Sequence, residues 1–168
     1  MKKYYFKEKF FKITDHYPIL DEDGKKTFFV DQTFKFLGYE AKVSDAHDKE
    51  LFTINRKLLA FLPIYYISFS DKSKKDMTIR SNLAFFKKSI DILMEDGKIN
   101  LKGNFWDYEF KMFYKGEVIG EASKKIFSLT DQYELKVLDE NFSLELIALC
   151  LALNNIKDLE NASSASNG

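Results

Sequence analysis

Apolar residues return at every second position through most of this chain, from the N-terminus to about residue 140. The clearest example runs from Phe28 to Val43, where the alternation changes parity at Gly38. Side chains of a β-strand point alternately to opposite faces of the sheet, so a period of two predicts strands with one buried face. We therefore expect this part of the chain to consist of strands.

The alternation is organised into six units of similar design between Tyr4 and Asn141. Each unit has an extended run, a knot of aromatic or large apolar residues, a returning run and an acidic or glycine-containing turn. Residues 10–17 and 126–133, in the first and last units, align without a gap. Turns of this composition join the strands of hairpins, so the six units predict about twelve strands. The expected turns cover residues 21–25, 45–49, 70–73, 95–98, 115–117 and 139–141.

Residues 144–156 break this pattern, because the stretch 146–153 contains no polar group except one thiol. A helix of that composition is apolar around its whole circumference and must be buried on all sides. Glu145 places a carboxylate in the first turn and Lys157 follows the last apolar residue, as helix ends prefer. The run is shorter than the about 20 apolar residues that span a bilayer. The expected core residues of the helix are Leu146, Ile147, Leu149, Cys150, Leu151 and Leu153.

The repeated hairpins are compatible with an open solenoid or a propeller, and also with a closed barrel. Closure is favoured because one long apolar helix follows the strands and needs an enclosing wall. Side chains fill a barrel of about eight strands, whereas a wider barrel leaves a lumen that a helix can occupy. We therefore predict an all-β fold with one buried helix. It is a closed antiparallel barrel of about twelve strands around a central C-terminal helix, formed by residues 1–158 and followed by a disordered polar tail at 159–168.

The charge of the whole chain is balanced, with 26 Lys and Arg against 26 Asp and Glu and a pI of about 6.7. Such a molecule has no overall field that attracts nucleic acid, so no nucleic-acid partner is expected. Cys150 is the only cysteine, so no intramolecular disulfide can form. Charges at positions 7–9 interrupt any signal-peptide core, which predicts a cytoplasmic protein without a transmembrane segment.

Catalytic and metal-binding patterns are weak in this sequence. His16 and His47 stand apart, and neither has the neighbouring ligands that a zinc site needs. The segment 44–48 contains the residue types of a nucleophilic site, but it falls in an expected turn. Trp106 could anchor in a membrane or stack on a ligand, although a single Trp in an apolar strand is more often part of the core. We therefore expect no enzyme activity, no cofactor and no bound metal.

Pairs of neighbouring cations are the remaining candidates for function. Solvent-facing lysines on strands protect the exposed backbone from pairing with other chains, which is the plain interpretation of these pairs. The functional interpretation is an anionic-lipid site, because each cation near a charged membrane contributes about 1 kcal/mol. Arg80 precedes an aromatic pair at 85–86 and two lysines follow it, which would place aromatic rings beside cations. The candidate lipid-binding residues are Arg56, Lys57, Arg80, Lys87, Lys88, Lys124 and Lys125.

Four segments, taken together and in this order, resemble the LURP-one-related family, including its bacterial YxjI-like members. They are 4–15 (YYFKEKFFKITD), 56–59 (RKLL), 103–108 (GNFWDY) and 123–133 (SKKIFSLTDQY). The resemblance extends over roughly residues 4–156. It implies a tubby C-terminal-like fold, a twelve-strand barrel threaded by a C-terminal hydrophobic helix, which phospholipid scramblases share. None of the four segments is a catalytic motif.

The same resemblance implies a function at membranes, because tubby domains bind phosphoinositides. The expected protein is non-enzymatic and regulatory, and it binds a phospholipid or phosphoinositide headgroup, or a membrane-associated protein, at the membrane periphery. An alternative is a protein-interaction scaffold linked to stress or transcription, as suggested for relatives. Phospholipid scrambling is a third possibility. It is disfavoured because the apolar run is short and Glu145 and Asn154 bracket it.

Overall fold

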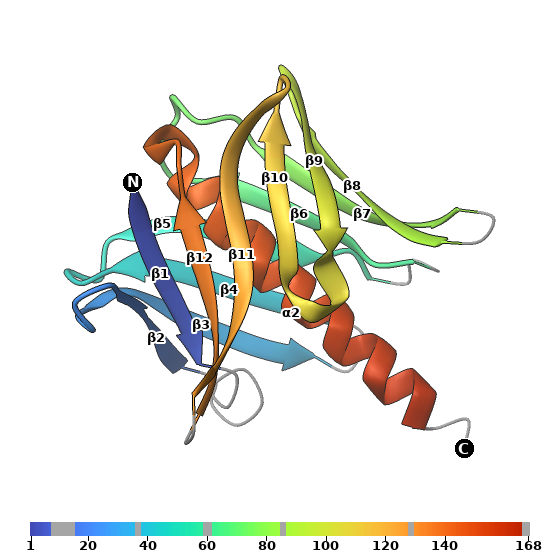
Figure 1. The fold of residues 1–168 in the computed structure, drawn as a ribbon, viewed down its shortest axis with the longest axis horizontal. Coiled ribbons are helices and arrows are strands. Elements are labelled where there is room, and N and C mark those ends of the chain that lie inside the picture. Colours follow the sequence, from blue (N-terminus) through green and yellow to red (C-terminus); the bar gives the residue numbers. More distant parts are fainter. Residues whose placement is uncertain (8–15, 36–37, 59–61, 85–86, 128–129, 166–168) are drawn as a thin grey trace.

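The computed structural model describes residues 1–7, 16–35, 38–58, 62–84, 87–127 and 130–165. Within these residues the chain forms twelve strands, two short 3-10 helices and one α-helix (Figure 1). Every strand pairs antiparallel with the next strand in the sequence, and β1 pairs with β12, so the barrel is closed. The predicted all-β barrel with one helix is therefore confirmed.

Each of the six predicted units supplies one pair of neighbouring strands, from β1 and β2 to β11 and β12. The strands are β1 (Lys2–Lys7), β2 (His16–Asp21), β3 (Lys26–Lys35), β4 (Gly38–Asp45), β5 (Glu50–Arg56), β6 (Ile64–Phe69), β7 (Met77–Ala84), β8 (Lys87–Met94), β9 (Gly97–Asn104), β10 (Glu109–Tyr114), β11 (Glu117–Phe127) and β12 (Thr130–Val137). The helices are η1 (Phe105–Asp107), η2 (Glu140–Phe142) and α2 (Ser143–Ala165).

Aspartate side chains hold the turns between these pairs. Asp21 and Asp45 each accept hydrogen bonds from the backbone N–H groups two and four residues later, at 2.8–3.1 Å. Asp71 accepts one from the N–H group two residues later, at 2.9 Å. These N–H groups stabilise the carboxylates and lower the pKa of all three below its usual value. The segment 44–48, with its catalytic residue types, is such a turn, and turn formation explains its composition.

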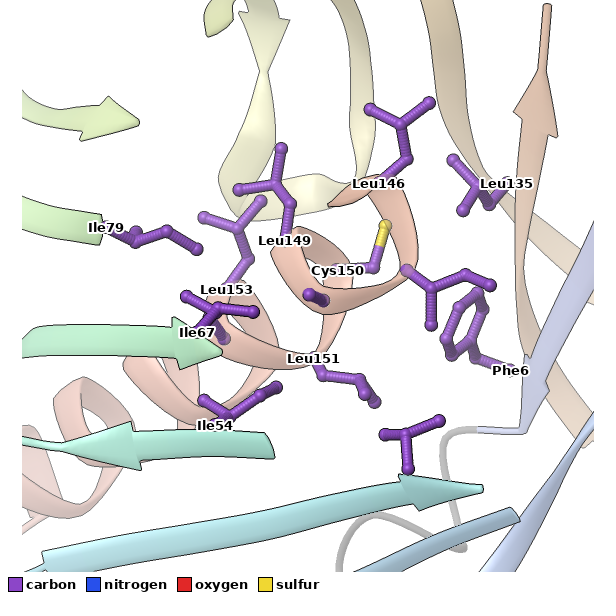
Figure 2. Close-up of a cluster of buried hydrophobic side chains, with 14 of the residues drawn as sticks. Phe6, Ile54, Ile67, Ile79, Leu135, Leu146, Leu149, Cys150, Leu151 and Leu153 are labelled. Atoms are coloured by element: carbon purple, nitrogen blue, oxygen red, sulfur yellow. The ribbon is translucent and has the colours of Figure 1, made fainter. Parts of the chain in front are cut away.

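The helix α2 runs through the interior of the barrel and emerges at one end (Figure 1). Its residues 145–156 are all buried, including the six expected core residues. Leu149 and Leu153 point toward the wall that carries Ile67 and Ile79, while Cys150 faces Phe6 on another side (Figure 2). The wall surrounds the helix, which is the physical reason that the run lacks a polar stripe.

A single glycine in the wall allows the helix to approach β11. A Cβ atom at Gly120 would lie 2.6 Å from Cδ1 of Leu146 and 3.0 Å from the backbone oxygen of Lys136. Both distances are shorter than van der Waals contact, and the second involves rigid backbone. Gly120 is therefore the point at which the start of the helix rests against the sheet.

The helix continues beyond the end that the sequence predicts. Residues 159–165, which we expected to be disordered, form the last turns of α2, and residues 161–165 are exposed. The physical reason is that propagation of a helix from an ordered segment costs little once its first turns exist, and no Gly or Pro interrupts this stretch. Within the described residues, no helix has both the length and the apolar composition required to cross a membrane.

Candidate functional site

The connections between the strands alternate between the two ends of the barrel, as they must in an up-and-down arrangement. The ends of the odd strands and the starts of the even strands that follow them lie at the end from which α2 emerges. Contacts of Arg56 and Tyr108 with the C-terminal half of α2 identify this end. We call the described strand ends and connections around the emerging helix the exit rim; it comprises residues 56–58, 62–64, 80, 105–108 and 124–125 and the start of β8. The turns at the opposite end form the turn rim.

All seven candidate lipid-binding residues lie at or near the exit rim, six of them on β5, β7, β8 and β11 and Lys57 directly after β5. Arg56 ends β5 and Lys124 lies three residues before the end of β11. These two strands are six positions apart in a ring of twelve, so they face each other across the barrel. The candidate residues therefore surround the emerging helix and do not form one compact pocket.

Strand geometry separates the members of each neighbouring pair. Arg56 has the parity of the buried Ile54 and reaches the helix, whereas Lys57 is exposed beyond the strand end. Lys124 is half-buried and opposite the buried Tyr133, whereas Lys125 lies on the outer face. Successive side chains of a strand point to opposite faces, so neighbouring cations do not act as a doublet.

The remaining three candidates lie on β7 and β8. Arg80 is exposed and stands opposite Asp91 in the register of the two strands. Lys87 and Lys88 begin β8, but their side chains lie outside the described part of the structure, as does the aromatic pair at 85–86. Of the seven, Lys57, Arg80 and Lys125 are thus the described cations that face outward at the exit rim.

Two neighbouring asparagines join the end of the buried helix to the wall. Asn155 Oδ1 accepts hydrogen bonds from the Tyr65 hydroxyl at 2.8 Å and from Arg56 Nη1 at 3.5 Å. Asn154 Oδ1 accepts one from the Tyr108 hydroxyl at 3.0 Å. Arg56 is therefore hydrogen-bonded to the helix, and its guanidinium group is directed toward the interior of the barrel.

A third amide extends this polar layer to the other side of the barrel. The hydroxyl groups of Tyr17 and Tyr39 both donate to Oε1 of the buried Gln32, at 3.4 and 3.3 Å. Buried polar groups require such partners, and the partners here lie on strands or, for Tyr108, at the end of η1. The bonds of Asn154 and Asn155 to the wall fix the depth and rotation of α2. We call the layer the tyrosine belt; its members are Tyr17, Tyr39, Tyr65, Tyr108, Gln32, Asn154 and Asn155.

Stability is expected to fall at alkaline pH, because five buried groups stay protonated in the folded state. Burial raises the pKa of Tyr17, Tyr39, Tyr65 and Tyr108 above the usual tyrosine value and that of Cys150 to about 12. In the unfolded chain they titrate near 10 for Tyr and about 8.5 for Cys. Above those values the unfolded state loses protons that the folded state retains, so each titrating group lowers the free energy of unfolding by about 1.4 kcal/mol per pH unit.

Urea denaturation from about pH 7 to about pH 11 measures this effect directly. Absorbance at the tyrosinate band should show the belt ionising together with unfolding. A free energy of unfolding that remained constant over the whole range would contradict the burial of these hydroxyl groups.

Apolar side chains accompany the cations of the exit rim. Leu58, which follows Lys57, is 56% exposed. Phe105 and Trp106 pack in a tilted arrangement, with ring centroids 4.7 Å apart, and are partly buried. Trp106, expected in the core, lies at the rim because it belongs to η1 and not to a strand. Asn104 caps η1 by accepting the backbone N–H of Trp106 at 3.2 Å.

Metal binding finds no support in the described residues, where no group of three or more His, Cys, Asp or Glu side chains converges. His16 Nδ1 lies 2.5 Å from a carboxylate oxygen of Asp31, its neighbour across β2 and β3. Cys150 is buried against the wall, where its raised pKa keeps the thiol protonated. The described side chains of the exit rim are therefore mainly cationic and apolar, with Asp107 as an exposed carboxylate among them.

Comparison of the sequence with known proteins identifies a family and a similar protein. The LURP-one-related family matches residues 2–154, which include all twelve strands and nearly all of the buried part of α2. The uncharacterised protein YxjI of Bacillus subtilis (strain 168) is 30% identical over 159 residues, which is 95% of this chain and 93% of that protein. No solved structure gives a significant match. The chain belongs to the LURP-one-related family.

Proposed function

We propose that this protein is a non-enzymatic, membrane-associated regulatory protein that binds anionic phospholipid headgroups through its exit rim. The observation that carries the proposal is the gathering of the candidate cations at one end of the barrel, around the emerging helix. Lys57, Arg80 and Lys125 face outward there, and the exposed Leu58 follows Lys57. Cations beside apolar side chains are typical of surfaces that rest on a charged bilayer.

Because the net charge is balanced, attraction to a membrane depends on where the charged side chains lie on the surface. The chain as a whole carries no excess charge, so attraction to a membrane must come from the end that faces it. Each outward cation near an anionic surface contributes about 1 kcal/mol, and added salt screens the attraction. Trp106 and Phe105 lie at the rim, where a partly buried aromatic ring can contact the headgroup region. The proposed binding is peripheral, salt-sensitive and dependent on lipid charge.

A role without catalysis is supported by the structural contacts of the side chains that could act as nucleophiles, acids or bases. The Cys150 thiol is enclosed in the barrel and the four belt tyrosines are engaged with amides. Asp45 is occupied in holding its turn. These groups have structural partners that explain their presence.

Vesicle flotation will test the proposal with a variant of the exit rim. Changing Lys57, Arg80 and Lys125 together to Gln removes three outward cations, each worth about 1 kcal/mol. The wild-type protein should float with phosphatidylglycerol vesicles at low salt, and the triple variant should bind about 100-fold more weakly. High salt should release the wild type, and neutral phosphatidylcholine vesicles should not retain it.

The matched control changes three exposed lysines near the turn rim, Lys26, Lys49 and Lys98, to Gln. Both variants lose the same charge, so only the position of the cations differs. Equal weakening in the two variants would show that attraction is not localised at the exit rim. Failure of the wild type to bind either kind of vesicle would exclude the lipid function.

A further inference from the structure

A row of charged side chains crosses the outer wall of the barrel at right angles to the strands. It runs over β9, β10, β11, β12 and β1, and each member stands directly opposite the next in the strand registers. In order, the members are Lys102, Lys111, Glu121, Lys136 and Lys3. We call these five residues the wall row. Four of them are cations, although they lie far apart in the sequence.

The wall row contains like charges in direct opposition. Lys102 is opposite Lys111, and Lys136 is opposite Lys3. Among the register pairs of the described residues, these two alone place like charges opposite each other. Other charged pairs join opposite signs, as Arg80 does with Asp91. Directly opposed like charges destabilise a sheet, so the chain retains an unfavourable arrangement at this one place.

An open hollow of about 560 Å³ lies beside the row on β9–β12. Its edges carry four lysines, Lys102, Lys111, Lys125 and Lys136, and its lining includes Gly103, Glu121 and Ser123. Gly103 has φ +119°, and a Cβ atom there would lie 2.4 Å from the backbone oxygen of Glu109. This position therefore accepts only glycine, which leaves the floor of the hollow without a side chain at that point.

The four lysines fall into two kinds. Lys111 Nζ lies 3.0 Å from Glu121 Oε1, and Lys125 Nζ lies 3.5 Å from Glu134 Oε1. In the described part of the chain, neither Lys102 nor Lys136 has a carboxylate partner; Lys102 Nζ instead lies 4.7 Å from the ring centroid of Phe113. Each side of the hollow thus has one lysine held by a glutamate and one whose charge is not neutralised.

We propose that this hollow binds a ligand that carries at least two phosphate groups. One phosphate is bound between Lys102 and Lys111 and the other between Lys125 and Lys136, with the Ser123 hydroxyl between them as a further donor. Lysine ammonium groups bind phosphate as compact point charges, and a bound anion removes the repulsion within the row. The same chemistry is offered by a doubly phosphorylated lipid headgroup and by a soluble polyphosphate ester. The hollow shares only Lys125 with the exit rim.

Titration calorimetry with tripolyphosphate tests the hollow without a membrane. The wild-type protein should bind one equivalent, and the Lys102→Gln/Lys136→Gln variant should bind at least about tenfold more weakly. The Lys26→Gln/Lys98→Gln variant loses the same charge from exposed positions outside the hollow and should bind like the wild type. Lys125 is left unchanged, so the outcome does not depend on the lipid function of the exit rim. Absence of saturable binding, or equal loss in both variants, overturns the proposal.

A second arm identifies the source of the phosphates. Vesicles with cardiolipin, which has two phosphates in one headgroup, are compared with phosphatidylglycerol vesicles of equal total charge. A preference for cardiolipin that disappears in the Lys102→Gln/Lys136→Gln variant assigns the hollow to a lipid headgroup. Tripolyphosphate binding without that preference assigns it to a soluble ligand.

Discussion

Changing Leu149 to Asp will unfold the barrel or leave it close to unfolding. Leu149 is 0% exposed and points from α2 toward the side of the wall that carries Ile67 and Ile79 (Figure 2). An aspartate there has no described polar partner, so its carboxylate would be buried alone. The expected loss is on the order of 5 kcal/mol, comparable with the whole stability of a small domain.

Urea denaturation of three variants measures this effect. Leu149→Ala removes apolar contacts without adding a charge and should cost about 2–5 kcal/mol. Leu159→Asp places the same new charge on the half-buried part of α2 beyond the buried segment and should cost less than about 1 kcal/mol. Near-normal stability of Leu149→Asp would mean that the helix does not occupy the lumen in solution.

Changing Lys74 to Met will strongly destabilise the protein at the other end of the helix. Lys74 Nζ lies 2.8 and 3.1 Å from the two carboxylate oxygens of Glu145 and 2.7 Å from the backbone oxygen of Asn141. Glu145 is only 3% exposed. Removal of the ammonium group leaves a buried carboxylate without its counter-charge, which costs about 3–5 kcal/mol.

A double-mutant cycle separates this penalty from the value of the ion pair. The Lys74→Met/Glu145→Leu variant removes both charges and should recover most of the lost stability, because buried ion pairs are often replaceable by apolar residues. Lys75→Met is the control. Its Nζ lies 2.9 Å from Glu95 in an exposed pair, so its loss should change stability little. If Lys74→Met were as mild as Lys75→Met, the buried pair would not anchor the helix.

The role of Glu145 illustrates what local sequence reasoning misses. Its place in the first turn of the helix is predictable, and the structure has it there. Its burial is not predictable, because the partner Lys74 lies 71 residues earlier in the turn between β6 and β7. From the sequence alone Glu145 is expected to be exposed to solvent, because an ionised carboxylate without a partner is costly to bury.

The tyrosine belt was hidden for a related reason. Tyr17, Tyr39 and Tyr65 occupy inward positions of the alternating pattern and therefore count as apolar residues in a sequence analysis. Tyr17 and Tyr39 find their partner Gln32 on the adjacent strand β3, whereas Tyr65 finds Asn155 only when the barrel closes around α2. The one local signal is the pair of amides at Asn154 and Asn155, at the end of an otherwise apolar run.

The candidate binding residues show the same division. Neighbouring lysines are easily recognised as candidates in the sequence, yet Lys124 and Lys125 lie on different faces of their strand. Lys102 and Lys136 are not recognisable as candidates, because neither has a neighbouring cation in the sequence. The registers of four adjacent strands bring them to one hollow.

Local patterns were thus sufficient to predict the strands and their number, the turns and the burial of the helix. The reason is that periodicity and turn chemistry act between residues close in the chain. Closure of the barrel added the exit rim, the tyrosine belt, the buried ion pair and the wall row. Each of these depends on contacts between distant strands or between a strand and the helix. Such contacts depend on register and depth of insertion, which no short stretch of sequence specifies.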